Sequence, residues 1–175
     1  NIVEGHSGFL YERLLNKELS LALLYKPAPR KDLDIIPLVQ TQLHLIGPPH
    51  KIGDVTPADA SRVFEDGLPL ILPASMHSPR VLIGEAFARH GKTLRLKLEV
   101  DGLPLTRTLV QLGFAFTILT YDAVYQQAQA GLLSTSLLPG SEFSWQLCIA
   151  LPASRRRSRG VDAVVDIAVG EVRRL

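Results

Sequence analysis

Two short motifs place reactive side chains beside glycines, as hydrolases and nucleotide-binding proteins do. Gly5-His6-Ser7-Gly8 resembles the G-x-S-x-G turn that presents a nucleophilic serine, but Phe9 stands where the last glycine of that turn is required. Gly91-Lys92-Thr93 resembles the end of a phosphate-binding loop, but Ala86 replaces the first glycine of that motif. The tripeptide also lies between an expected helix and an expected strand, which is the wrong order. Neither motif therefore predicts a catalytic or nucleotide-binding site.

The histidines, the carboxylates and the single cysteine form no pattern typical of a metal site or an acid–base pair. No two histidines have the i, i+4 spacing of a helical metal site. Asp32 and Asp34 lie in a turn-like stretch, where solvated carboxylates are common. Cys148 lies in the apolar run 145–151, and we interpret it as a small buried side chain. We therefore expect no cofactor, no metal and no enzymatic activity. The histidines are His6, His44, His50, His77 and His90.

The composition is that of an ordinary globular protein. Of the 175 residues, 46% are hydrophobic and 21% are charged, and the formal net charge of +2 is too small to indicate a nucleic-acid or membrane partner. We therefore interpret the basic run 155–159 as a solvated loop rather than a phosphate-binding patch. No stretch approaches the roughly 18 apolar residues of a membrane span. No signal peptide is recognisable either, so we expect a cytoplasmic location.

Strand-like and helix-like segments alternate along the chain, which indicates an α/β fold with mostly parallel sheets. Apolar or alternating runs predict strands, and apolar stripes at helical spacing predict helices. Ser7 is expected to cap the first helix, and glycines at 91, 113 and 131 are expected to end three later ones. Strands are predicted at 2–3, 21–25, 36–39, 42–46, 70–72, 94–100, 114–119 and 145–151, and helices at 10–15, after 57, 80–90, 105–112, 121–130 and 161–172.

Two of the expected helices carry apolar residues that predict packing. The segment 161–172 has valines and alanines at i, i+3, i+4, i+7, i+8 and i+11, which is the clearest amphipathic pattern in the chain. The segment 80–90 has more apolar residues than one buried face needs, and we interpret the surplus as a surface for a partner. These residues are Val81, Leu82, Ile83, Ala86 and Phe87.

Several segments, taken in order, resemble the regulatory domain of LysR-type transcription regulators. Residues 2–7 (IVEGHS) are similar to that family's I-x-V/L-x-E-G-x-S/T strand and loop. Residues 14–23 (LLNKELSLAL) resemble its L-x-x-G-x-L-D-L-A-L segment, with Lys17 and Ser20 in place of the usual glycine and aspartate. Residues 43–50 (LHLIGPPH) resemble the strand that leads to the hinge.

Further along the chain, residues 110–120 (VQLGFAFTILT) resemble V-A-A-G-L-G-Y-T-I-L-P, with Thr120 in place of the usual proline. Residues 69–73 and the loop after them are most similar to the subgroup that includes nitrogen-assimilation regulators. Together these segments span nearly the whole chain, so the resemblance concerns the entire domain.

The resemblance implies a two-lobed, periplasmic-binding-protein-like fold of type 2 with a central cleft between the lobes. Lobe I would comprise residues 1–52 and 143–175, and lobe II residues 53–142. The family's first strand and helix and its winged helix-turn-helix domain would lie upstream of Asn1. DNA would then be contacted only through that missing domain. The family also implies a homodimer or a tetramer, and no membrane partner.

Effector-binding residues are expected where loops at the carboxyl ends of strands lead into helices, because backbone N–H groups there attract anionic groups. We expect a small organic acid or similar polar metabolite to bind there and to bias hinge closure or dimer packing. Some of these residues have structural alternatives: Ser7 as a helix cap, and Thr117 as a strand residue with a bonded hydroxyl. The expected effector-binding residues are Ser7, Gly8, Tyr25, Ala74, Ser75, Met76, His77, Thr117 and Thr120.

The predicted function is therefore that of an effector-binding domain that couples ligand binding to the control of transcription. One alternative is a solute-binding protein of the same fold that serves transport, which would require an export signal. The other is an enzyme on a related scaffold, which would require a nucleophile or a titratable pair in the cleft, and the sequence offers neither.

Overall fold

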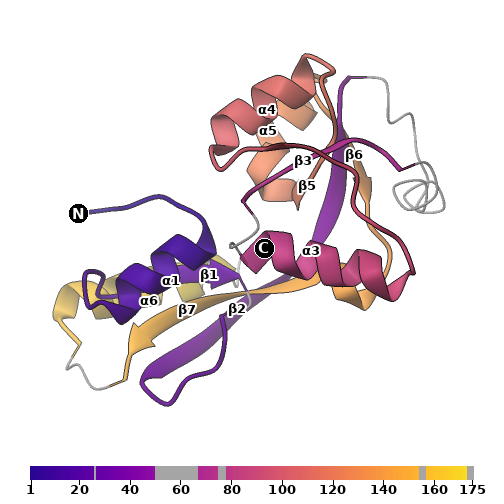
Figure 1. Ribbon diagram of the computed structural model, residues 1–175. Helices are drawn as coiled ribbons and strands as arrows, with labels where there is room; N and C mark the ends of the chain where they lie inside the picture. Colours follow the sequence, from indigo (N-terminus) through magenta and orange to yellow (C-terminus); the bar gives the residue numbers. More distant parts are fainter. Residues whose placement is uncertain (26, 50–66, 75–77, 154–156, 173–175) are drawn as a thin grey trace. The chain divides into compact units, whose positions relative to one another are not determined.

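The computed structural model is an α/β protein, as the sequence predicts (Figure 1). It describes residues 1–25, 27–49, 67–74, 78–153 and 157–172. The chain divides into two units: unit 1 comprises Asn1–Thr41 and Trp145–Leu175, and unit 2 comprises Gln42–Ser144. Two long strands, β2 (Leu33–Gly47) and β7 (Ser144–Pro152), carry the chain from one unit to the other. The division expected from the sequence, with crossings after residues 52 and 142, stays a prediction, because a strand shared by two units gives no sharp boundary.

Unit 1 is built on three strands in the order β1 (Ala22–Tyr25), β7 and the first part of β2. β1 pairs antiparallel with β7, with Ala22 opposite Ala150 and Tyr25 opposite Leu147. Two helices complete the unit, α1 (Ser7–Leu15) before the sheet and α6 (Arg159–Val172) after it.

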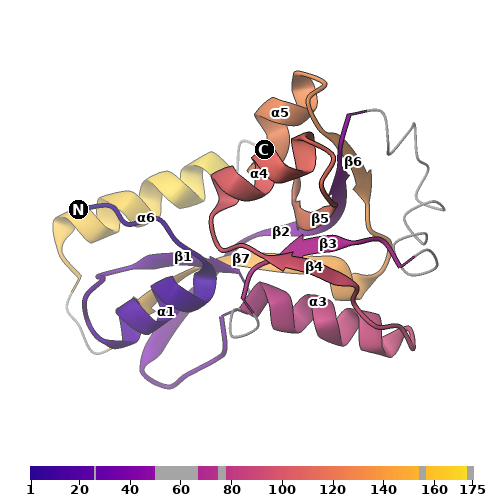
Figure 2. The same cartoon turned by 45° about the horizontal axis from the view of Figure 1, so that its top comes forward.

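The two helices cover opposite faces of this sheet (Figure 2). Side chains alternate between the faces of a strand: Ala150 packs with Leu14 of α1, whereas its neighbours Ile149 and Leu151 pack with Val165 of α6. The amphipathic pattern predicted for α6 is confirmed, although Val164, which the pattern also includes, is 48% exposed. The α1 face buries Leu14, Ala22, Leu24, Leu33 and Ala150.

The described residues of unit 2 form strands in the order β4 (Leu96–Glu99), β3 (Leu70–Leu72), β5 (Thr117–Thr120), the second part of β2, and β6 (Ser134–Leu137). β3 pairs parallel with β4, and a parallel bridge between Leu70 and Phe116 connects it to the segment that leads into β5. β5 and β6 both run antiparallel to β2.

Helices lie on both sides of the strands of unit 2. Figure 2 shows α3 (Ser78–Arg89) on one side, and α4 (Leu103–Gln111) with α5 (Tyr125–Gln129) on the other. The 3₁₀ turn η2 (Tyr121–Val124) precedes α5, and the 3₁₀ turn η3 (Ser141–Phe143) precedes β7. The glycines predicted to end α3, α4 and α5 all have positive φ, which confirms them as helix ends. The core on the α4 and α5 side contains Ile46, Ile71, Val110, Ala115, Val124 and Leu133.

Three predictions about the strands are wrong. The sheets are not mostly parallel, because β2 and β7 cross between the units in opposite directions and pair antiparallel with their neighbours. Residues 2–3 form no strand, because they pair with none of the strands in the described chain, and Ile2 is 92% exposed. The segments 36–39 and 42–46 are parts of one strand, β2. The helix predicted after residue 57 falls outside the described residues.

Candidate functional site

The expected effector-binding residues of unit 1 lie where α1 begins beside the end of β1. Ser7 does not cap α1 as predicted, because the N-cap is His6, whose side chain makes no capping hydrogen bond. The Ser7 hydroxyl instead accepts the backbone N–H of Tyr25 at 3.1 Å and so joins the first turn of the helix to the end of the strand. Since a hydroxyl can accept and donate at once, Ser7 keeps a proton for a second partner. Gly8 follows it in the first turn of α1.

Tyr25 belongs to an aromatic pair at the same end of β1. Its ring lies 5.9 Å from that of Trp145, at an interplanar angle of 51°. Trp145 is buried and Tyr25 is half-buried. The contact between the two rings favours one orientation of Tyr25.

Gly5, the first glycine of the rejected serine motif, has a packing role. A Cβ at this position would come within 2.5 Å of the Phe9 ring, which would have to move. The guanidinium of Arg13 also lies over the Phe9 ring, 5.4 Å from its centre. The glycine that suggested a nucleophile turn is therefore explained by a close approach between the N-terminal segment and α1.

In unit 2, the two predicted threonines of β5 point to opposite faces of the sheet. Thr117 is opposite Ile46 and Thr120 is opposite Leu43, and alternating positions of β2 face opposite sides. The Thr117 hydroxyl is buried and donates to the carbonyl of Ile71 at 2.8 Å, so it ties β5 to β3. Thr120 is buried at the carboxyl end of β5, immediately before η2. The structure therefore does not bring these two hydroxyls together.

The loop after β3 was predicted to contribute four residues, of which the structure describes one. Ala74 donates its backbone N–H to Asp101 Oδ1 at 2.9 Å. Asp101 lies just beyond the carboxyl end of β4 and just before α4, so this carboxylate stands at the edge where ligands are expected in parallel sheets. Ser75, Met76 and His77 lie outside the described residues, and their roles stay predictions.

Sequence reasoning missed His44 and Asp101. His44 lies on β2 between Leu119 of β5 and Leu137 of β6, and its ring is 5.4 Å from that of Tyr121. Partial burial lowers the pKa of His44 below its usual value. The alternation of His44 with Leu43 and Leu45 was a usable signal, because it places the imidazole on one defined face of a strand.

Two further observations concern chemistry that the described residues do not offer. Among them, no group of three histidine, cysteine or carboxylate side chains is placed to hold a metal ion. No helix in the described part of the chain is long and apolar enough to cross a bilayer. Cys148 is buried as predicted, and burial raises the pKa of its thiol above the usual value.

With the fold and these strand ends in place, comparison with known proteins defines the class. The family model described as the LysR substrate binding domain matches residues 1–173. The chain therefore belongs to the LysR substrate-binding domain family. This confirms the resemblance inferred from the motifs, whereas the subgroup of nitrogen-assimilation regulators stays a prediction.

Individual proteins support the same class. The transcriptional regulator BbuR of Bordetella bronchiseptica is 30% identical over 177 residues, which cover 99% of this chain and 53% of BbuR. The effector-binding domain of QuiR, solved with shikimate, has a TM-score of 0.79 at 14% identity and covers 99% of this chain and 81% of its own. The regulatory domain of Synechocystis CcmR, solved with 2-PG, has a TM-score of 0.77 at 17% identity. The match covers 95% of this chain and 80% of the CcmR chain.

These likenesses establish the fold. It is that of LysR effector-binding domains, the periplasmic-binding-protein-like fold of type 2 predicted from the sequence. The chain spans about half the length of BbuR.

Proposed function

We propose that this chain is the small-molecule-sensing domain of a cytoplasmic transcription regulator, whose effector is an organic acid or a similarly polar metabolite. The family match over residues 1–173 carries this proposal. It is supported by two solved domains of the same fold that hold shikimate and 2-PG, the first of which is a cyclic carboxylic acid bearing hydroxyl groups. Control of transcription would require a DNA-binding domain outside this sequence.

Each unit, taken by itself, offers groups that suit such a ligand. In unit 1, the first turn of α1 has no side-chain cap on its backbone N–H groups, and these groups favour anions. The Ser7 hydroxyl proton is beside them. In unit 2, the N–H of Ala74 is already bonded to Asp101, so at this position a ligand would meet a carboxylate. An acid group on an effector would suit the environment in unit 1, and a hydroxyl group that donates to the carboxylate would suit the environment in unit 2.

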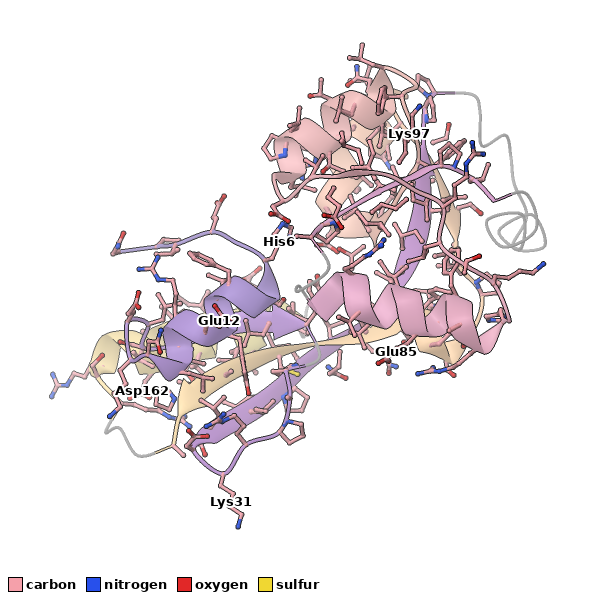
Figure 3. The ribbon with its side chains drawn as sticks, viewed as in Figure 1. His6, Glu12, Lys31, Glu85, Lys97 and Asp162 are labelled. Carbon is pink, nitrogen blue, oxygen red and sulfur yellow. The ribbon has the colours of Figure 1, made fainter. Side chains whose placement is uncertain are left out.

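A homodimer or tetramer is the second part of the proposal. Most of the apolar surplus predicted for α3 proves to be core, because Ile83, Ala86 and Phe87 are buried. The remaining outer face is represented by Val81, which is 47% exposed, and by Glu85, which Figure 3 labels on this helix. Val81 is therefore the exposed apolar side chain through which we propose that α3 contacts a partner.

A thermal-shift screen of the protein against organic acids and hydroxy acids tests the proposal. An effector that prefers the folded state must raise the melting temperature in a concentration-dependent way. Ser75→Ala and His77→Ala should weaken this stabilisation, whereas Ser20→Ala, an exposed position in the loop before β1, should not. A ligand response that is unchanged in both site variants would exclude the loop after β3 from the site.

A further inference from the structure

Three aromatic side chains of unit 2 form a continuous row that the proposed function does not use. The rings of His44 and Tyr121 are 5.4 Å apart and tilted by 37°, and the rings of Tyr121 and Tyr125 are 5.8 Å apart and edge-on. Tyr121 follows the last residue of β5 and continues its alternation, so it lies on the same face as Leu119 and His44. We call His44, Tyr121 and Tyr125 the aromatic row.

The aromatic row is open to solvent at one end and closed at the other. Tyr125 is 52% exposed, and Leu137, which is opposite His44 on the neighbouring strand, is 41% exposed. On the other side, Ile46, the next residue of β2 on this face, belongs to the fully buried core. The aromatic row therefore extends from the buried core of unit 2 to the surface. At the surface, a ligand could cover the exposed side chains of Tyr125 and Leu137.

The buried side of the His44 ring fixes where its proton lies. Its Nδ1 atom is buried and has no hydrogen-bond partner among the described residues. A proton on Nδ1 would leave a buried N–H unsatisfied, and buried N–H groups without a partner are rarer in proteins than buried acceptors without one. Burial also lowers the pKa of the ring. At neutral pH His44 is therefore uncharged, with its proton on Nε2, and it offers one neutral N–H donor beside the Tyr121 ring.

The Tyr121 ring is held in place from its other end. The side-chain amide of Gln129 donates to the Tyr121 hydroxyl at 3.2 Å, and Tyr125 contacts the ring edge. A ring fixed in this way loses little conformational entropy when a flat group packs on it. Its position directly after Thr120 places it at the carboxyl end of β5, where ligands of α/β sheets bind.

We propose that the aromatic row of unit 2 binds the effector, and that it selects carboxylates bearing a flat ring. The ring of the ligand packs on Tyr121, and a ligand oxygen accepts the Nε2–H of His44. This proposal rests on the proposed function and narrows it, because an open-chain acid would use the donor but leave the aromatic surface uncovered.

The test compares benzoate with cyclohexanecarboxylate, which has the same charge and nearly the same size but a puckered ring. Isothermal titration calorimetry on the whole chain should show tighter binding of benzoate. Tyr121→Leu and His44→Leu should each weaken benzoate binding about five- to tenfold, as expected for one stacking contact or one hydrogen bond. His44→Gln keeps a donor at a similar position and should retain most of the affinity. Tyr11→Leu, a half-buried tyrosine of unit 1, is the matched control and should bind normally.

Equal affinity for the two ligands, or benzoate binding that Tyr121→Leu leaves unchanged, would overturn the proposal. Stabilisation by succinate without any response to benzoate would also overturn it, while leaving the proposed function intact. No response to any of the three acids would count against both. A measurement on the unsubstituted protein does not depend on folding of the variants: ¹⁵N NMR of the histidines should show the His44 proton on Nε2, and a proton on Nδ1 would refute the argument.

Discussion

The two units of the molecule bury different kinds of side chain. In the described part of unit 1 the buried positions are apolar, and helices seal both faces of the sheet. The buried polar side chains of the described chain are all in unit 2, namely Thr106, Thr117, Thr120 and Ser136. Within the residues that the structure describes, the buried polar atoms without a partner are in unit 2 as well, namely His44 Nδ1, Arg80 Nη1, Arg107 Nε and Ser136 Oγ.

This difference indicates a division of roles. Buried polar groups lower stability unless they are hydrogen-bonded, and unsatisfied ones are tolerated where recognition requires them. Unit 1 is therefore the unit with an apolar core, and unit 2 carries the buried polar groups, of which those without a partner should lower its stability. Three measurements test this division of roles.

The largest effect should come from removing a core side chain in each unit. Leu14→Ala in unit 1 and Ile71→Ala in unit 2 each remove a fully buried side chain and should cost about 2–5 kcal/mol. The single tryptophan, Trp145, lies in unit 1 and reports on that unit. Because β2 and β7 are shared, we expect urea unfolding followed by fluorescence and by circular dichroism to shift together in both variants.

Leu105→Ala, at a position 54% exposed, serves as the control for these two variants and should change stability by less than about 0.5 kcal/mol. If Ile71→Ala moved the circular-dichroism transition but left the tryptophan transition in place, the two units would unfold independently. The contrast between them would then be one between separate domains.

A smaller effect, with opposite signs, should distinguish two buried hydroxyls of unit 2. Thr117→Val removes a donor to the Ile71 carbonyl and should destabilise the protein by about 1–2 kcal/mol. Ser136→Ala removes a buried hydroxyl without a partner in the described chain and should be neutral or stabilising by up to about 1 kcal/mol. Denaturant midpoints measure both. Equal destabilisation by the two substitutions would show that the Ser136 hydroxyl has a hydrogen-bond partner in solution. This hydroxyl would then not count as an unsatisfied group that distinguishes unit 2 from unit 1.

The smallest effect concerns the contact between His90, the residue after α3, and Glu142 of η3. His90 Nε2 lies 2.7 Å from Glu142 Oε1, and this contact lowers the pKa of Glu142 below its usual value. Because the folded pKa is the lower one, the stabilisation is present above the unfolded value and is lost as the pH falls through the folded value. Glu142→Gln should therefore cost roughly 0.5–1 kcal/mol near neutral pH and nothing in strong acid.

Thermal unfolding across pH tests this dependence, with Glu12→Gln on α1, labelled in Figure 3, as an exposed control. A stability difference that persisted unchanged below the pH range where carboxylates titrate would mean that Glu142 acts through packing alone. The turn η3, which precedes β7, would then be held by packing and not by the charge of Glu142.

The sequence predicted the parts of this fold that depend on local pattern. The amphipathic stripe of α6, the glycine at the end of α3 and the short apolar run of β3 are all read from neighbouring residues, and all three are confirmed. The polar segment STSL of β6 was missed, because its strand character comes from pairing with β2 and not from its own residues.

The candidate site was less accessible to the same reasoning. Alternation along a strand is enough to predict that Thr117 and Thr120 face opposite sides. The hydrogen bond from Thr117 to the Ile71 carbonyl could not be predicted, because it requires β3 to lie beside β5. In the same way, the meeting of His44 with Tyr121 joins residues far apart in the chain through a strand register. Contacts of this kind depend on topology, which a single sequence does not contain.

The discontinuity of unit 1 has a consequence for the order of events during synthesis. Its sheet requires β1 and the first part of β2, which are synthesised before the rest of unit 2, and β7, which is synthesised after it, whereas the described strands of unit 2 are all available once Ser144 has left the ribosome. Until then, the apolar faces of β1 and α1 have no complete sheet to pack in. We expect nascent chains to form unit 2 first, and chains arrested before β7 to depend on chaperones that cover exposed hydrophobic surface.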